Sequence, residues 1–249
     1  NAMTPFQQQY TELAARFRKQ PNQHNHAAIG ALYDLKAALE RAEATRETAD
    51  LLTSVNSLLC LHASALQTFA PFADTGERKD IIRLHKLRDQ AAWKGDRFAL
   101  KDIRTLRATL PPIHLSPADI TPDGEGGHCL RCGVVILNKT VADGSNIRIT
   151  LADGAIADYA PRIIATLETL AQYPAAALID YYNRECSAYV ERDADQDWFD
   201  TLEIYSVSIH CRNGVLYSNI NSGDTYFLDA YLTIQFEDDK LRTMRFGMT

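Results

Sequence analysis

The sequence contains none of the short motifs that mark a common catalytic centre. No serine stands in a G-x-S-x-G nucleophile elbow, and no G-x-x-x-x-G-K-[ST] phosphate loop occurs among the 249 residues. The glutamates of the expected helices form no Glu-x-x-His pair of the kind that binds two iron ions. No enzyme class is therefore indicated, and we expect a non-enzymatic protein without a cofactor.

Long apolar runs and a strong positive charge are also missing. No stretch approaches the roughly eighteen uninterrupted apolar residues of a membrane-spanning helix. The net charge of -6 argues against a nucleic-acid partner, because phosphates attract a cationic surface. Glutamines at 7–9 stand where a signal peptide has its apolar core, so we expect a cytoplasmic, bacterial-type protein. Asn1 and Ala2, before Met3, resemble the remnant of a cleaved tag.

Cysteine is scarce and odd in number, which favours reduced thiols over a disulfide framework. Cys129 and Cys132 have the C-x-x-C spacing that lets two thiolates bind one zinc ion. The other neighbouring pair of potential ligands is His210-Cys211, at the end of an expected strand. Because a structural zinc site takes four ligands and no second C-x-x-C exists, we expect no metal at these candidates. A zinc-binding enzyme or regulator that uses Cys129 and Cys132 stays an alternative.

The composition changes near residue 111. Before this point the chain is rich in Ala, Leu, Arg, Lys and Glu, and it holds only three of the twelve glycines. Apolar residues recur there at helical spacing. We expect helices at residues 5–19, 25–43, 48–69, 77–93 and 97–109. Helices of this length with short loops favour antiparallel neighbours, so the segment 4–110 is predicted to be a helical domain.

A segment rich in proline and glycine follows at 111–128. It contains four prolines and then the run Asp123-Gly124-Glu125-Gly126-Gly127. Proline fixes φ and removes a hydrogen-bond donor, whereas glycine frees the backbone. We therefore expect a linker here and a second domain at 129–249.

The second domain combines strands and helices. We expect a hairpin from 133–141 to 146–151 that turns at Asp143-Gly144, and then two helices. Four alternating segments end the chain, at 202–211, 215–221, 226–236 and 241–248. Asn213-Gly214 between the first two is a strong hairpin signal. The pattern predicts an α+β protein, in which a helical bundle precedes an antiparallel sheet with helices on one face.

An acidic segment precedes the final strands. Asp193, Asp195 and Asp197 alternate as in a calcium loop, but Trp198 and Ile204 stand where that loop has Gly and Glu. The pattern therefore predicts a solvated acidic loop rather than a calcium site. If the protein binds a basic partner, we expect the three aspartates to assist its capture and Trp198 to be the central anchor.

Three stretches of the C-terminal half carry a resemblance. They are Leu-Glu-Ile-Tyr-Ser-Val-Ser-Ile at 202–209, the Asn213-Gly214 turn, and Gly-Asp-Thr-Tyr-Phe at 223–227. With them, the region 132–248 resembles a group of uncharacterised bacterial α+β domains. Some of these look like immunity proteins of polymorphic toxin systems, including contact-dependent growth inhibition. The resemblance implies a toxin domain as protein partner and no catalytic residue. The tryptophan that usually follows Gly-Asp in such domains is absent here.

Three functions follow from these patterns. The first is an immunity protein that binds and neutralises a toxin. The second is the zinc-binding enzyme or regulator. The third is a structural module in which the helical domain mediates oligomerisation, and the sequence leaves the oligomeric state open.

Overall fold

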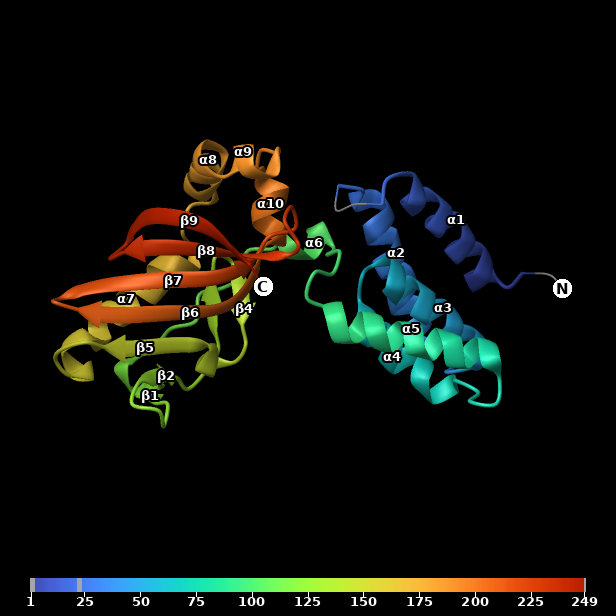
Figure 1. Ribbon diagram of the computed structural model, residues 1–249, viewed down its shortest axis with the longest axis horizontal. Coiled ribbons are helices and arrows are strands. Elements are labelled where there is room, and N and C mark those ends of the chain that lie inside the picture. Colours follow the sequence, from blue (N-terminus) through green and yellow to red (C-terminus); the bar gives the residue numbers. More distant parts are fainter. Residues whose placement is uncertain (1–2, 22–23, 249) are drawn as a thin grey trace. The chain divides into compact units, whose positions relative to one another are not determined.

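The computed structural model describes residues 3–21 and 24–248, so the expected tag remnant lies outside the described residues. The chain divides into two compact units, Asn1–Arg107 and Ala108–Thr249 (Figure 1). Unit 1 is helical and unit 2 holds the sheet, which confirms the predicted α+β class. Within the described residues, no helix has both the length and the apolar character needed to cross a membrane.

Unit 1 is a bundle whose helices begin at clear capping residues. Thr4 and Thr45 each form a capping box at the start of a helix, which satisfies backbone N–H groups that lack an intrahelical partner. Leu32, Val55 and Leu59 are fully buried at its centre. The helices are α1 (Pro5–Lys19), α2 (His26–Arg41), α3 (Arg46–Leu58), α4 (His62–Phe69), α5 (Arg78–Lys94) and α6 (Ile103–Leu106), with a 3-10 turn at Ala70–Phe72.

Two helix predictions in unit 1 were wrong in extent. The helix expected at 48–69 is broken into α3 and α4, because Cys60 adopts a left-handed φ of 59°. The free carbonyl of Leu59 at this break accepts a hydrogen bond from the N–H of Leu100 at 2.8 Å. The helix expected at 97–109 shrinks to the single turn of α6, since the preceding residues extend along the bundle to make that bond.

Unit 2 is built on a seven-stranded mixed sheet with the order β1-β2-β5-β6-β7-β8-β9. All neighbouring strands are antiparallel except β5 and β6, which run parallel with Ile149 opposite Ile209. The strands are β1 (Ile120–Pro122), β2 (His128–Leu130), β5 (Ile147–Leu151), β6 (Glu203–Arg212), β7 (Val215–Gly223), β8 (Ala230–Glu237) and β9 (Lys240–Met248). The strands β6 to β9 form the predicted C-terminal meander (Figure 1).

The expected hairpin around Asp143-Gly144 is not formed. Instead, β3 (Val134–Ile136) and β4 (Lys139–Val141) pair with each other through a two-residue turn. Leu137 and Asn138 adopt the positive φ angles of this turn, 48° and 60°. Because glycine is the usual residue at such angles and the turn has none, the sequence gives little reason to expect a turn here. Residues 144–146 form a 3-10 turn capped by Asp143, and this turn sends β5 to the large sheet.

The segment 111–128 is part of unit 2 rather than a linker. It contributes β1 and the start of β2, and its glycine run is the turn between these two strands. Asp123 holds this turn by accepting hydrogen bonds from the N–H groups of Glu125 and Gly127 at 2.7 and 3.0 Å. A carboxylate that binds turn amides therefore orders a sequence whose composition indicates flexibility.

Helices cover one face of the sheet. The long helix α7 (Ile156–Ala171) lies across it (Figure 1), and its fully buried Ile163 and Leu167 belong to one core with Val207 and Ile220 of the strands. Three further helices follow, α8 (Ala175–Glu185), α9 (Ser187–Val190) and α10 (Gln196–Thr201). The last of these was not expected, and it begins at the end of the acidic segment, with Asp195 as its N-cap.

Candidate functional site

The acidic segment is a braced loop between α9 and α10. Glu191 ends α9 with a left-handed φ of 55°, and Asp195 caps α10 by accepting the N–H of Trp198 at 2.9 Å. Asn183 of α8 exchanges two hydrogen bonds with the backbone of Ala194, at 2.6 and 3.0 Å. These contacts fix the backbone of the loop against α8 and hold the Asp195 carboxylate at the start of α10.

Trp198 lies in the core, and the expectation that it anchors a surface contact is therefore wrong. Its exposed fraction is 0 %, and its ring centre lies 4.6 Å from that of Tyr182. Its Nε1 and the hydroxyl of Tyr182 both donate to Asp224 Oδ2, each at 2.9 Å. Burial, followed by the nearby Asp224 carboxylate, raises the pKa of Tyr182 far above its usual range. Tyr182 thus remains a neutral donor to a fully buried carboxylate.

Asp224 organises the turn that follows β7. Its Oδ1 accepts hydrogen bonds from the N–H groups of Tyr226 and, at 3.3 Å, Phe227. Gly223 precedes it because a Cβ there would lie 2.0 Å from the hydroxyl oxygen of Tyr205. The Gly-Asp pair of the resemblance therefore has a structural role: it shapes the turn that presents Phe227.

Phe227 belongs to an aromatic cluster in which one ring, that of Tyr189, is largely exposed. Its ring centre lies 5.3 Å from that of Phe246 on β9 and 5.9 Å from that of Tyr189 on α9. Tyr189 stacks on Phe246 at 5.8 Å with an interplanar angle of 21°, yet 71 % of Tyr189 is exposed. Next to the cluster Leu228 is 45 % exposed. Phe227 and Phe246 are half-buried, so Tyr189 and Leu228 are the residues here that present the most apolar surface to solvent.

The acidic loop and the aromatic cluster are connected. The guanidinium of Arg192 lies 4.0 Å from the ring centre of Tyr226, and the hydroxyl of Tyr226 is 3.4 Å from Asp195 Oδ1. Burial, and then Asp195, raise the pKa of Tyr226 above its usual range. We call the surface formed by Tyr189, Asp193, Asp195, Phe227 and Phe246 the acidic–aromatic surface. Asp197, in contrast, is only half-exposed and lies in the first turn of α10.

The four candidate metal ligands do not form one site. Within the described part of the chain, no cluster of three or more potential ligand side chains includes any of them. His210 and Cys211 are consecutive on β6 and so point to opposite faces: His210 is exposed and Cys211 is buried. Cys129 lies half-buried on β2, with its Sγ 3.9 Å from Thr121 Oγ1.

Burial governs the thiols of the core. It raises the pKa of Cys186 and of Cys211 to about 11, so both stay protonated near neutral pH. A protonated, enclosed thiol is a poor nucleophile and a poor metal ligand. Neither residue therefore offers accessible thiolate chemistry.

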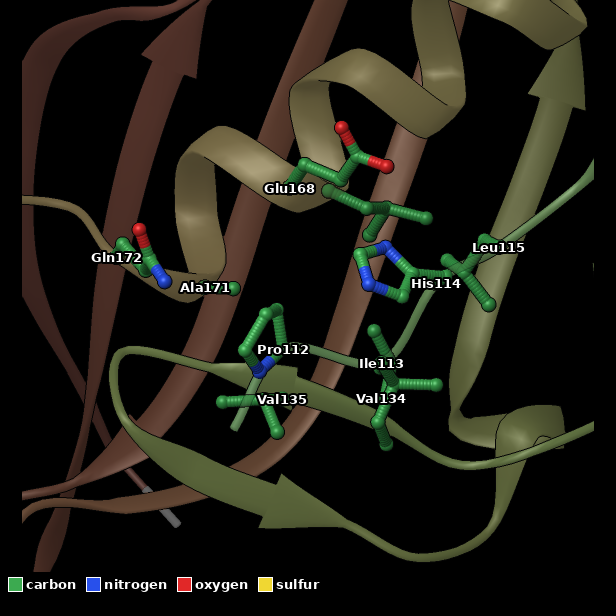
Figure 2. Close-up of a pocket in the computed structure, with 10 residues that line it drawn as sticks. Pro112, Ile113, His114, Leu115, Val134, Val135, Glu168, Ala171 and Gln172 are labelled. Atoms are coloured by element: carbon green, nitrogen blue, oxygen red, sulfur yellow. The ribbon is translucent and has the colours of Figure 1, made fainter. Parts of the chain in front are cut away.

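A pocket of about 240 Å³ lies where the segment 112–115 covers α7 and β3 (Figure 2). Its walls are mainly apolar, and His114 and Glu168 are the ionisable side chains among the lining residues. Figure 2 shows the His114 ring and the Glu168 side chain on the same side of the pocket. The volume is below the roughly 300–1,000 Å³ of ordinary ligand sites, so the pocket is a weaker candidate than the acidic–aromatic surface.

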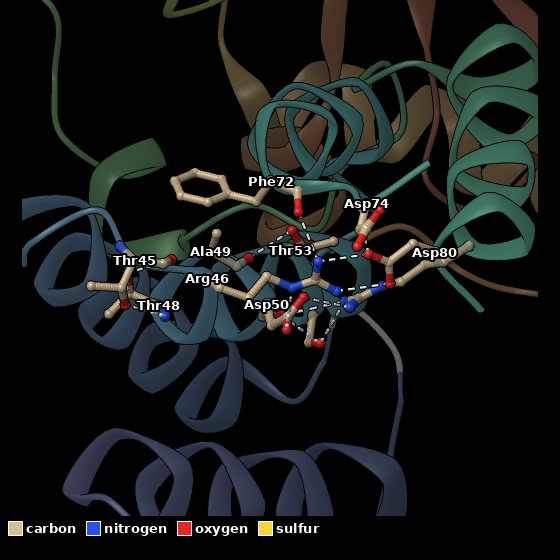
Figure 3. A network of polar contacts seen from close by, with 11 residues as sticks. Thr45, Arg46, Thr48, Ala49, Asp50, Thr53, Phe72, Asp74 and Asp80 are labelled. Atoms are coloured by element: carbon tan, nitrogen blue, oxygen red, sulfur yellow. Dashed lines mark hydrogen bonds and ion pairs between the residues drawn. The ribbon is translucent and has the colours of Figure 1, made fainter. Parts of the chain in front are cut away.

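Unit 1 contains a network of charged side chains around Arg46 (Figure 3). Arg46 binds both carboxylate oxygens of Asp80, at 2.6 and 2.8 Å, and donates to Asp50 and to the carbonyl of Phe72. The Arg46 guanidinium, helped by the N–H of Asp74, holds the pKa of Asp80 well below its usual range. Because the network joins α3, the 3-10 turn and α5, its role is to stabilise the bundle.

No protein-family model, no curated protein and no solved structure matches this chain.

Proposed function

We propose that the protein is a non-enzymatic binding protein, an immunity protein that neutralises a bacterial toxin domain through the acidic–aromatic surface. The observation that carries the proposal is the exposed ring of Tyr189, stacked on half-buried Phe246, beside the exposed carboxylates of a braced loop. The sequence resemblance to immunity domains supports the same function.

The aromatic part of the surface suits the centre of an interface. Tyrosine and phenylalanine are enriched in interface cores, because they bury a large rigid area at a small cost in side-chain entropy. Tyr189 is 71 % exposed and already oriented by its stack on Phe246, so binding would cost little further ordering. Tyr189 therefore replaces Trp198 as the proposed anchor.

The acidic part suits a basic partner. Asp193 is exposed and makes no ion pair with any residue that the structure describes, and Asp195 is exposed at the cap of α10. Like charges on one short loop repel each other, and a cationic partner relieves that repulsion. Such exposed charges act mainly on the rate of association, and salt screens them within about 10 Å at 0.1 M.

Co-purification with the product of a neighbouring toxin gene tests the proposal. We expect Tyr189→Ala to weaken the complex by at least about 30-fold, as truncation of a central anchor costs about 2 kcal/mol. Tyr217→Ala is the matched control, since Tyr217 is an exposed tyrosine near the start of β7, whereas the turn that presents Phe227 follows the end of this strand. Equal losses from both variants, or a complex that neither variant weakens, would place the binding surface elsewhere.

A further inference from the structure

The outward face of α5 in unit 1 exposes large apolar side chains. Trp93 is 88 % exposed and Ile82 is 57 % exposed, whereas the second tryptophan of the chain, Trp198, is fully buried. The inward face of α5 is already used, because Leu84 and Leu87 pack with Phe69 of α4 in the core. The exposed pair therefore lies outside the face that packs α5 into the bundle.

The exposed pair has a regular geometry. Ile82, Lys86, Asp89 and Trp93 follow one another at i, i+4, i+7 and i+11, which places them in one row along the helix. All four are exposed. With a rise of about 1.5 Å per residue, the two apolar ends of this row are about 16 Å apart. A partner helix of three turns spans that distance.

The charge around this row is opposite to that of the whole protein. Of the exposed cations of α5, Lys86 lies in the row, Arg78 and Lys79 lie beside its first turn, and the others lie on the two flanks of the helix, while Asp89 is the exposed carboxylate of the same helix. The cations are Arg78, Lys79, Lys86, Arg88 and Lys94. Among the residues that the structure describes, none of these five has an ion-pair partner. The ion pairs of α5 use Asp80 (Figure 3) and Arg83. In a chain with net charge -6, α5 thus keeps unpaired cations in and beside this row.

We propose that this face of α5 docks an acidic protein segment that inserts apolar side chains against Ile82 and Trp93. The cations of α5 complement an acidic segment, and Asp89 in the middle of the row complements a single cation of the partner. A membrane surface fits less well, because an interfacial helix needs a continuous apolar face and here Lys86 and Asp89 interrupt it. A nucleic acid also fits less well, since Asp89 would repel its phosphates.

A synthetic helical peptide provides the probe. It has leucine at i, i+4, i+7 and i+11 and glutamate at most other positions, and its counterpart has lysine in place of glutamate. We expect the glutamate peptide to shift the emission of Trp93 to shorter wavelength and to reduce its quenching by acrylamide. Trp198, which is buried, contributes little to the quenching change.

Variants of the full chain then locate the contact, with a fluorescein-labelled peptide and anisotropy as the readout. We expect Trp93→Ser to weaken binding of the glutamate peptide at least about 10-fold, and Lys86→Glu to weaken it several-fold. The control Lys240→Glu makes the same charge change on exposed β9 of unit 2 and should alter binding less than two-fold.

Four results would overturn the proposal. The first is failure of the glutamate peptide to bind, and the second is equal binding of the lysine peptide. The third is stronger protection of Trp93 by phosphatidylglycerol vesicles or by a single-stranded oligothymidylate, which would make the face a lipid or nucleic-acid site. The fourth is protection of Trp93 by increasing protein concentration alone, which would make a second copy of the chain the occupant.

Discussion

Removal of one hydroxyl, by Tyr182→Phe, tests whether the buried Asp224 carboxylate holds unit 2 together. The hydroxyl donates to Asp224 Oδ2 at 2.9 Å, and Tyr182 is fully buried. Phenylalanine keeps the ring and its contact with Trp198, so the main loss is one hydrogen bond to a charged group. Such a bond contributes about 1.5–3 kcal/mol, and we expect the free energy of unfolding to fall by about 2 kcal/mol. For a chain of this size, this corresponds to a Tm lower by about 4–8 °C.

Urea unfolding followed by tryptophan fluorescence measures this loss. Trp198 is buried in unit 2 and Trp93 is 88 % exposed in unit 1, so the change in emission on unfolding comes mainly from unit 2. The control Tyr217→Phe removes a hydroxyl from a tyrosine that is 39 % exposed, and it should change the unfolding free energy by less than about 0.5 kcal/mol. A loss below about 0.5 kcal/mol for Tyr182→Phe, with an unchanged m value, would refute the assigned role of this hydrogen bond.

Three further predictions concern other parts of the chain. Gly144→Ala should lower the unfolding free energy of unit 2 by about 3 kcal/mol, because a Cβ would lie 2.3 and 2.4 Å from the carbonyl oxygens of Cys132 and Leu130. The control Gly247→Ala should be neutral, because a Cβ there would meet open space. Acid should weaken unit 1, because the pKa of Asp80 is lower in the folded chain than its value of about 4 in the unfolded chain. The stability that this difference gives is complete above the unfolded pKa and is lost as the pH falls towards the lower folded pKa. In circular-dichroism melts, Asp80→Asn should therefore abolish much of this pH dependence. A thiol reagent at pH 8 should modify half-buried Cys129 and Cys132 long before Cys186 and Cys211, whose pKa of about 11 reflects burial; equal rates for all five thiols would contradict these burial assignments.

Local patterns in the sequence predict the regular elements well. The apolar spacing and the caps indicate α1, α2 and α5 to within a few residues, and Asn213-Gly214 indicates the β6–β7 turn. What they miss depends on contacts between distant residues or on side chains that bind the backbone. The break at Cys60 is compensated by the N–H of Leu100, and the glycine run of 124–127 is ordered by Asp123. The parallel pairing of β5 with β6 joins strands separated by four helices, which no local pattern indicates.

The candidate site shows the same division. The sequence indicates the acidic loop, and the structure retains exposed Asp193 and Asp195 there. It does not distinguish Trp198, which lies in the core, from Tyr189, which lies on the surface nine residues earlier. The sequence does hold a partial signal: Asp195 three residues before Trp198 has the spacing of a helix cap, which predicts a helix that contains Trp198. The contact of Phe227 with Phe246 depends on the turn that Asp224 holds, which sequence spacing does not reveal.

The most direct test of the acidic–aromatic surface separates its two parts by kinetics with the proposed toxin partner. Asp193→Lys should slow association several-fold at about 0.02 M salt and have little effect at about 0.5 M, because screening removes the attraction between exposed charges. Tyr189→Ala should leave association nearly unchanged and speed dissociation at least about 10-fold, since a central anchor acts mainly on the lifetime of the complex. Unchanged association for Asp193→Lys at low salt, together with unchanged dissociation for Tyr189→Ala, would contradict the proposed binding surface.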